Sequence, residues 1–310
     1  MLTSTLTHVN ATLCKASAGN GGAFFSSGTG AGSWSDITLD RNSARQGGAL
    51  FASGSQSLCI DRASITENTA QTGGAAYFDA FAALSMSDSV VRNNTASSQG
   101  AALSLNRAAA SDFTRVLFAR NSAPSAGGVF CSHADTLSFV STSFDANTAS
   151  DGSGGALFAD DCAITFANLN CTNNRALQVS QAANGGAFAL TAGSSIAGNR
   201  CFFQRNAAAG NAGAISATDI LDSSMVDCVF DANSAGGSGG AMSLDFDAGM
   251  QVTLSDLLVQ YNVAGSQAGA IYLPRSFPQL SAYTQRGNTA AFGNNRVSPP
   301  VRVLWLASTS

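Results

Sequence analysis

Apolar and polar residues alternate over short stretches of this chain, and the stretches recur about every 26 residues. Each unit carries a small apolar block that opens with glycine or alanine, such as GGAF at Gly21 and GGAL at Gly47. The other eight blocks begin at Gly73, Gly100, Gly127, Gly154, Gly185, Ala212, Gly239 and Ala268. Alternation with period two favours half-buried strands, whereas an amphipathic helix would repeat every 3.6 residues.

An asparagine forms the second landmark of each unit and is usually followed two residues later by alanine. The asparagine positions are Asn42, Asn68, Asn94, Asn121, Asn147, Asn174, Asn206, Asn233, Asn262 and Asn295. An apolar residue lies three positions before each of them, in the order Leu39, Ile65, Val91, Phe118, Phe144, Cys171, Phe203, Phe230, Val259 and Phe292. The residues beside this column, such as Asp145, Arg205 and Asp231, are polar and are expected to face water.

This repeat predicts an all-β fold, a right-handed single-stranded parallel β-helix (β-solenoid, pectin-lyase-like) of about ten coils, with residues 1–310 as one domain. Like residues would then lie above like residues at the strand spacing of roughly 4.8 Å. Phe118 would stack on Phe144, and Phe203 on Phe230. The asparagine column would form a ladder, because each amide offers both a donor and an acceptor to its neighbours.

The second element of the repeat reads Phe-x-x-Asn at Phe118–Asn121, Phe144–Asn147, Phe203–Asn206, Phe230–Asn233 and Phe292–Asn295. Paired with the Gly-Gly-Ala-apolar block, it resembles the repeats of the chlamydial polymorphic outer membrane proteins over nearly the whole chain. The resemblance implies a β-helical passenger, often adhesive, that is displayed on a cell surface after export through a C-terminal β-barrel. We expect the chain to be a piece of a longer gene product whose export signal and anchor lie elsewhere.

Charge narrows the classes of function. The chain has one lysine, Lys15, and one glutamate, Glu67, and its formal net charge is −4. Without a basic block it has nothing to neutralise a phosphate backbone, so nucleic-acid binding is not expected. No apolar run is long enough to cross a bilayer, so this segment is not expected to insert into a membrane.

Catalysis requires clustered groups, and the sequence offers few. Asp160 and Asp161 are adjacent, but neighbours on a strand point to opposite faces unless they lie in a turn. Asp245 and Asp247 would share a face, with no Lys, His or repeated Arg evident beside them in sequence. We therefore expect no enzyme, no cofactor and no metal site, since His8 and His133 are isolated. The alternative is a carbohydrate-active enzyme, a polysaccharide lyase or glycoside hydrolase, on the same fold.

Seven cysteines are too few and too scattered for a disulfide scaffold. Cys201 and Cys228 occupy one column in consecutive coils, so they are either a disulfide or two buried thiols. Glycosylation sequons begin at Asn10, Asn93 and Asn170. Two insertions lengthen the repeat, at residues 175–184 and around Pro274 and Pro278.

These features together predict a secreted or cell-surface structural or adhesive module, located at the outer membrane or envelope if the source is bacterial. The expected partners are a host, matrix or neighbouring surface protein or a glycan, bound on the outer faces or on projecting loops.

Overall fold

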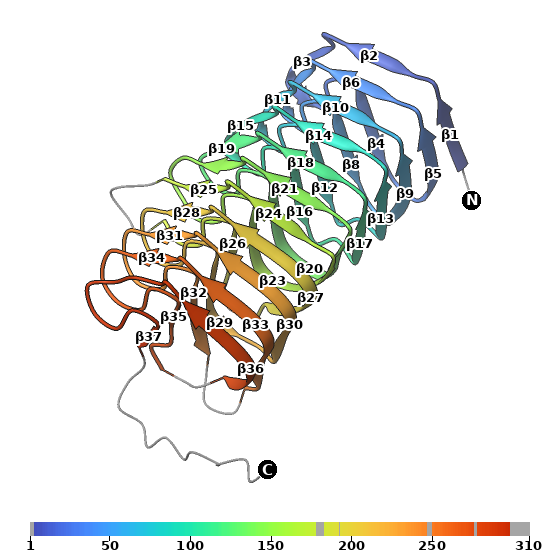
Figure 1. The fold of residues 1–310 in the computed structure, drawn as a ribbon. Helices are drawn as coiled ribbons and strands as arrows, with labels where there is room; N and C mark the ends of the chain where they lie inside the picture. Colours follow the sequence, from blue (N-terminus) through green and yellow to red (C-terminus); the bar gives the residue numbers. More distant parts are fainter. Residues whose placement is uncertain (1–2, 178–182, 192, 247–249, 276–277, 298–310) are drawn as a thin grey trace.

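The computed structural model describes residues 3–177, 183–191, 193–246, 250–275 and 278–297. The described chain is all-β and winds into a solenoid of about ten turns, confirming the predicted fold class (Figure 1). Every pairing between its strands is parallel, and each coil bonds to the coils before and after it. The three or four strands of a coil form two sheets, one of 27 strands and one of 10.

The strands fall into four columns that run along the solenoid axis. The glycine-block column holds β4 (Phe24–Ser27), β8 (Leu50–Ser53), β12 (Ala76–Asp79), β16 (Leu103–Asn106), the start of β20 (Val129–Val140), the start of β23 (Leu157–Ala167), β26 (Phe188–Leu190), β29 (Ile215–Ile220), β32 (Met242–Phe246), β35 (Ile271–Tyr272) and β37 (Arg296–Val297). The second column holds β1 (Thr3–Thr7), β5 (Gly30–Ser35), β9 (Gln56–Asp61), β13 (Ala83–Ser87), β17 (Ala110–Thr114), the ends of β20 and β23, and the starts of β27 (Ser195–Gln204), β30 (Ser223–Asp231), β33 (Val252–Gln260) and β36 (Gln279–Arg286).

The third and fourth columns flank the asparagine turn. The third holds β2 (Asn10–Thr12), β6 (Thr38–Asp40), β10 (Ser64–Thr66), β14 (Val90–Arg92), β18 (Leu117–Ala119), β21 (Ser143–Asp145), β24 (Asn170–Thr172) and the ends of β27, β30, β33 and β36. The fourth forms the ten-stranded sheet of β3 (Lys15–Asn20), β7 (Ser43–Gln46), β11 (Thr69–Thr72), β15 (Thr95–Gln99), β19 (Ser122–Ala123), β22 (Thr148–Ala149), β25 (Arg175–Ala176), β28 (Ala207–Ala208), β31 (Ser234–Ala235) and β34 (Val263–Ala264).

The core is a set of apolar columns inside the coils. Phe118 stacks on Phe144 with ring centroids 4.9 Å apart, and Phe203 stacks on Phe230 at 5.0 Å. All four rings are fully buried, as predicted. Arg205, one of the residues expected to face water, is exposed, and Asp145 is partly exposed. The period-two pattern therefore assigned the inner and outer faces of these strands correctly.

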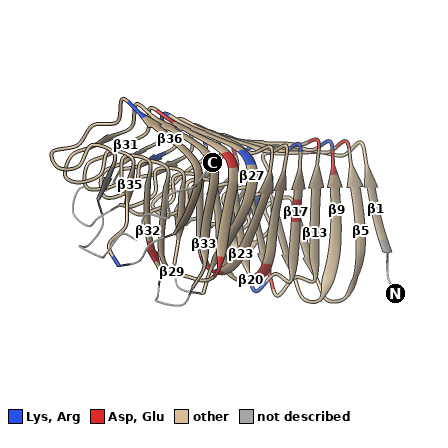
Figure 2. Ribbon diagram, turned by 60° about the horizontal axis from the view of Figure 1, so that its bottom comes forward, with Lys and Arg blue, Asp and Glu red and all other residues tan. Residues whose placement is uncertain are grey.

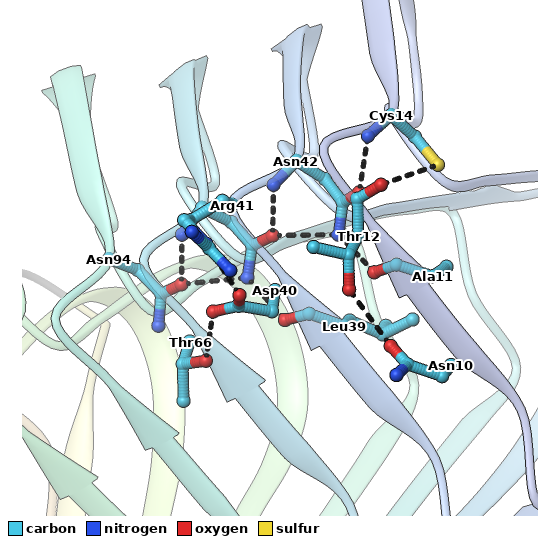
Figure 3. A network of polar contacts seen from close by, with 11 residues as sticks. Asn10, Ala11, Thr12, Cys14, Leu39, Asp40, Arg41, Asn42, Thr66 and Asn94 are labelled. Atoms are coloured by element: carbon cyan, nitrogen blue, oxygen red, sulfur yellow. Dashed lines mark hydrogen bonds and ion pairs between the residues drawn. The ribbon is translucent and has the colours of Figure 1, made fainter.

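The buried asparagines form a continuous ladder (Figure 3). The backbone N–H and Nδ2 of Asn68 both donate to Oδ1 of Asn94, at 2.9 and 3.0 Å. Nδ2 of Asn68 also donates to the carbonyl oxygen of Leu39 in the preceding coil, at 2.9 Å. The same pattern repeats from Asn42 to Asn262, so each amide joins three coils.

Both ends of the ladder differ from the repeat. In the first coil, Cys14 occupies the position that asparagine has in later coils, and its backbone N–H donates to Oδ1 of Asn42. At the last rung, Asn262 donates to Oδ1 of Asn288 at 3.0 Å and not to Asn295. Asn295 is exposed, and its Oδ1 accepts a long bond of 3.4 Å from Nδ2 of Asn288.

The predicted tenth rung at Asn295 is therefore wrong, and Phe292 is not a core residue but is 69% exposed. Asn288 keeps the Asn-x-Ala signature through Ala290, whereas Asn295 lacks it. Phe292 lies three residues before Asn295, as an apolar residue does before the ladder asparagine of each earlier coil, and therefore pointed to Asn295. The residue three before Asn288 is polar Gln285, so Asn288 did not match this part of the repeat.

The glycine block turns the chain between the fourth column and the next coil. Gly47 has φ +62, and a Cβ at this position would collide with the carbonyl of Leu50. Glycine is the residue that adopts this left-handed conformation without steric cost. The block thus fixes where each coil closes.

Candidate functional site

The repeat is longest at the joint between the coil of β23 and the coil of β26 and β27, although the strands stay paired across it. Successive ladder residues are 26 to 29 positions apart elsewhere, but Asn174 and Asn206 are 32 apart. The extra residues belong to the predicted insertion 175–184, of which 178–182 lie outside the described residues. Two surface hollows, described below as the groove and the corner pocket, have lining residues on both sides of this joint. The joint is therefore the strongest candidate for a functional site.

A glycine, Gly198, is one of the residues that line the larger hollow. In register, Gly198 of β27 lies between Phe166 of β23 and Met225 of β30, so it occupies an inward-facing position. With no side chain at Gly198, the ring of Phe166 fills the place where one would stand. Phe166 and Gly198 are also among the residues that line a hollow on the outer face of the second column.

We call this hollow the groove. It has a volume of about 490 Å³ and crosses β20, β23, β27 and β30. Small side chains, Ala167 and Ala197, leave its floor low, and Val140 and Val226 stand at its two ends, each 38% exposed. Ser138, Thr165, Asn199 and Ser224 add hydroxyl and amide groups to its lining. No charged side chain lines the groove in the part of the chain that the structure describes.

A second hollow of about 260 Å³ continues the groove toward β33 and shares Ala197 and Ser224 with it. Asp222, Gln251 and Thr253 also line it. Oδ1 of Asp222 accepts a hydrogen bond of 2.6 Å from the N–H of Gln251, which holds this carboxylate at the rim. The two hollows together form one elongated depression along the solenoid axis.

A separate pocket, the corner pocket, lies where the chain turns from the first to the second column. It measures about 260 Å³ and is lined by His133, Asp135, Asp161 and Ser195, among others. His133 and Asp161 have φ of 52 and 54, so the adjacent carboxylates Asp160 and Asp161 do lie at a turn. Asp160 nevertheless accepts a bond of 2.7 Å from Thr191 outside the pocket lining, and the two do not form a pair there.

The chemistry of the corner pocket is limited. Nδ1 of His133 lies 2.7 Å from Oγ of Ser132, which leaves its other ring nitrogen for a ligand. Among the described residues, no three His, Cys, Asp or Glu side chains come together in a way that could hold a metal ion. His8, the second histidine, stands far off in sequence at the first coil beside β1.

The structure corrects one expectation about Asp245. Its carboxylate does have a basic neighbour, because Arg275 donates to it at 2.5 and 2.6 Å and to Asp219 at 2.5 Å. Arg275 follows Asp245 by 30 residues and was not visible as a neighbour in sequence. The other proposed partner, Asp247, lies outside the described residues.

Charged side chains gather along the turns that border the sheets (Figure 2). Arg62 forms a two-bond ion pair with Asp36 at 2.7 and 2.8 Å, and Arg115 pairs with Asp88 at 2.6 Å. The hydrogen bond from Arg62 lowers the pKa of Asp36, and that from Arg115 lowers the pKa of Asp88. These pairs join neighbouring coils on the outside, as the asparagine ladder does on the inside.

Two disulfides join neighbouring coils. Cys201 and Cys228 are bonded, with Cα atoms 4.6 Å apart, so the structure selects the disulfide over two thiols. The second bond, between Cys131 and Cys162 with Cα atoms 6.8 Å apart, was not predicted. The register partner of Cys131 is Ala159, and that of Cys162 is Ala134. An alignment of the repeats pairs only register partners, so it could not predict this bond. The two disulfides lie on either side of the long joint.

Aromatic side chains form an outward-facing row on the glycine-block column that the sequence analysis missed. Phe25, Phe51 and Tyr77 stack with centroids 5.2 and 5.5 Å apart, and Phe130 stacks on Phe158 at 5.5 Å. Burial raises the pKa of Tyr77. In the sequence, these aromatic residues directly follow the first residue of the strand, as in Leu50-Phe51 and Val129-Phe130.

The remaining candidates lie apart from the groove. The sequon residues Asn10, Asn93 and Asn170 are all exposed, and Asn93 has φ 55 at a corner. No helix among the described residues is long and apolar enough to cross a membrane.

The chain was compared with family models, with curated proteins and with solved structures, and none of the three comparisons gave a match.

Proposed function

We propose that the protein is a structural or adhesive module outside the cell, without catalysis, that binds a host, matrix or neighbouring surface component on its outer faces. The observation that carries this proposal is the groove with its continuation, an elongated depression on an otherwise regular solenoid face. Extended concave surfaces are the way solenoid proteins usually bind their partners. The resemblance of the repeats to the polymorphic outer membrane proteins agrees with this role.

The cysteines support an extracellular or cell-surface location. Cys131–Cys162 and Cys201–Cys228 are disulfides between adjacent coils. Disulfides persist in oxidising compartments and are rare in the cytosol. The location would be the outer membrane or envelope in a bacterial source.

Adhesion is tested by measuring binding of the fluorescently labelled chain to fixed cells and to surfaces coated with extracellular matrix. Saturable binding that is lost when the same protein is unfolded by heat is the expected result. The labelled unfolded protein controls for non-specific sticking of a chain with many apolar residues. Linear, unsaturable retention of the folded protein would contradict the proposal.

A polysaccharide lyase or glycoside hydrolase is the second candidate, and the corner pocket is the observation that favours it. His133, Asp135 and Asp161 bring a base and two acids to one hollow. Reducing-end assays on pectin, xylan and cellulose test this candidate. Cleavage that disappears in an Asp161→Asn variant but persists in Asp112→Asn would replace the adhesive proposal with the enzymatic one.

A further inference from the structure

We propose that the groove and its continuation bind a neutral, extended polysaccharide chain that lies along the solenoid axis. This inference rests on the proposed adhesive function and names its ligand. The elongated form is the starting point, since the depression runs from β20 to β33, four strand spacings or about 19 Å. A compact small molecule would occupy one part of such a depression, whereas a polymer can use all of it.

The charge of the lining selects a neutral ligand. The groove presents hydroxyl, amide and apolar groups, with no charged side chain among its described lining residues. The one carboxylate nearby, Asp222, lies in the continuation. It would repel an acidic polysaccharide, and no cation in the lining offsets it.

The hydroxyl groups form a row along one side. Ser138, Thr165, Ala197, Ser224 and Thr253 follow one another in register, so that four of five coils present a hydroxyl at intervals of roughly 4.8 Å. One hexose unit has a similar length. A sugar chain along the axis can therefore meet a hydroxyl partner at nearly every unit.

The other side and the floor are suited to the C–H faces of sugar rings. The residues that line the floor, Phe166, Ala167, Ala197 and Gly198, carry no polar side chain. Mostly apolar sites with a few placed polar groups are typical for small ligands and cofactors. On the opposite side the Asn199 side chain, which no described residue binds, can hydrogen-bond a ligand hydroxyl.

A peptide is a poorer occupant of the same surface. The backbone groups of β23, β27 and β30 are paired within the sheet and cannot add a strand on their face. A bound peptide would bring one N–H and one C=O per residue against alanine, glycine and valine, where burying unpaired groups is costly. The polar groups of a polysaccharide lie at the ring edges and can stay in water.

Isothermal titration calorimetry on the whole oxidised chain tests this inference. The probes are cellohexaose, xylohexaose and mannohexaose, with hexagalacturonate as the acidic counterpart. At least one neutral hexasaccharide should bind about tenfold or more tighter than hexagalacturonate. Tighter binding of hexagalacturonate, or no heat from any neutral probe, overturns the inference.

Two matched variants place the ligand. Ala197→Arg fills the groove from its floor and should weaken binding by about tenfold or more. Ala83→Arg makes the same change on the outer face of β13, away from the groove, and should leave binding unchanged. Equal binding by the wild type and by Ala197→Arg would show that the sugar binds elsewhere.

The two proposals fail separately. If the Ala197→Arg variant loses hexasaccharide binding but still adheres to cells and matrix, adhesion uses another face and the groove assignment stands. Adhesion by a protein that binds no neutral hexasaccharide leaves the function and removes this ligand.

Discussion

The ring of Phe166 fills the space that a side chain at Gly198 would require, and the two residues are direct register partners in adjacent coils. In neighbouring coils the same inward column holds Phe139 and Met225. The missing side chain at Gly198 thus leaves room in the core for the Phe166 ring, and both residues lie at the groove.

Gly198→Ala should destabilise the protein by about 1–3 kcal/mol, because the added methyl group collides with the Phe166 ring in a packed interior. Chemical denaturation measures the loss. Ala197→Ser, an outward change at the next position, should stay within about 0.5 kcal/mol. Combining Gly198→Ala with Phe166→Leu should recover part of the loss. No recovery would mean that the glycine is needed for another reason.

The asparagine ladder should end at Asn288. Asn288→Ala removes the side-chain acceptor of the Asn262 N–H and the side-chain donor to the carbonyl of Val259, at a cost of about 2 kcal/mol or more. The matched change Asn295→Ala, at an exposed residue, should cost less than about 0.5 kcal/mol. Urea unfolding of both variants compares them directly, and equal losses would contradict the revised register.

Thiol reactivity should separate the seven cysteines. The oxidised protein has thiols at Cys14, Cys59 and Cys171. Burial raises the pKa of Cys171 well above its usual range, so this thiol should not react with Ellman's reagent in the folded state. Exposed Cys59 should react quickly, and denaturant should reveal all three. Five or more reactive thiols in denaturant would disprove at least one disulfide.

Removing a disulfide should weaken the protein substantially. Replacing both Cys201 and Cys228 by alanine opens a link between residues 27 apart, for which chain entropy gives a loss of about 3–4 kcal/mol. Thermal unfolding with and without reductant measures it. The double variant should still unfold at a lower temperature in reductant, because it keeps Cys131–Cys162, which links residues 31 apart. Equal Tm values of the wild type and the double variant in the absence of reductant would contradict the prediction.

Acid should weaken the ion pairs Arg62–Asp36 and Arg115–Asp88 and so lower the stability of the fold. The folded pKa values of Asp36 and Asp88 lie below the ordinary value of 3.8. Their stabilisation is therefore complete above that value and is lost as the pH falls through the lower folded pKa. The Tm of the wild type should drop more steeply below about pH 4 than that of the Asp36→Asn, Asp88→Asn variant. Asp112→Asn, at an exposed carboxylate, is the control and should follow the wild type.

Much of the fold could be predicted because the same pattern of apolar, asparagine and glycine positions occurs in about ten successive units. Inward Phe144, buried Asn147 and the glycine turns each follow from a local preference that recurs in every coil. The last coil was misread because a single Phe-x-x-Asn match at Phe292 outweighed the Asn-x-Ala match at Asn288.

The candidate site was less visible because it depends on exceptions to the repeat. The groove lies where the outward residues Ala167 and Ala197 are small and the outward residues Val140 and Val226 of the flanking coils are larger, a contrast between coils that the repeat does not contain. The Cys131–Cys162 bond joins residues that are not register partners, and the contact of Arg275 with Asp219 joins residues two coils apart. Alignment of columns reveals what stacks directly, not what meets across a turn.

The asparagine ladder allows coils to be added one at a time, so it bears on the length of the molecule as well as on its stability. Each ladder asparagine, such as Asn68, accepts from the coil before it and donates to the coil after it, so a duplicate of the 26 residues from Asn68 to Asn94 would find matching neighbours on both sides. Each such duplication would extend the rod by about 4.8 Å without altering the coils beyond it. The reach of the molecule is thus a length that gene duplication can adjust in single steps, independently of the surface it presents.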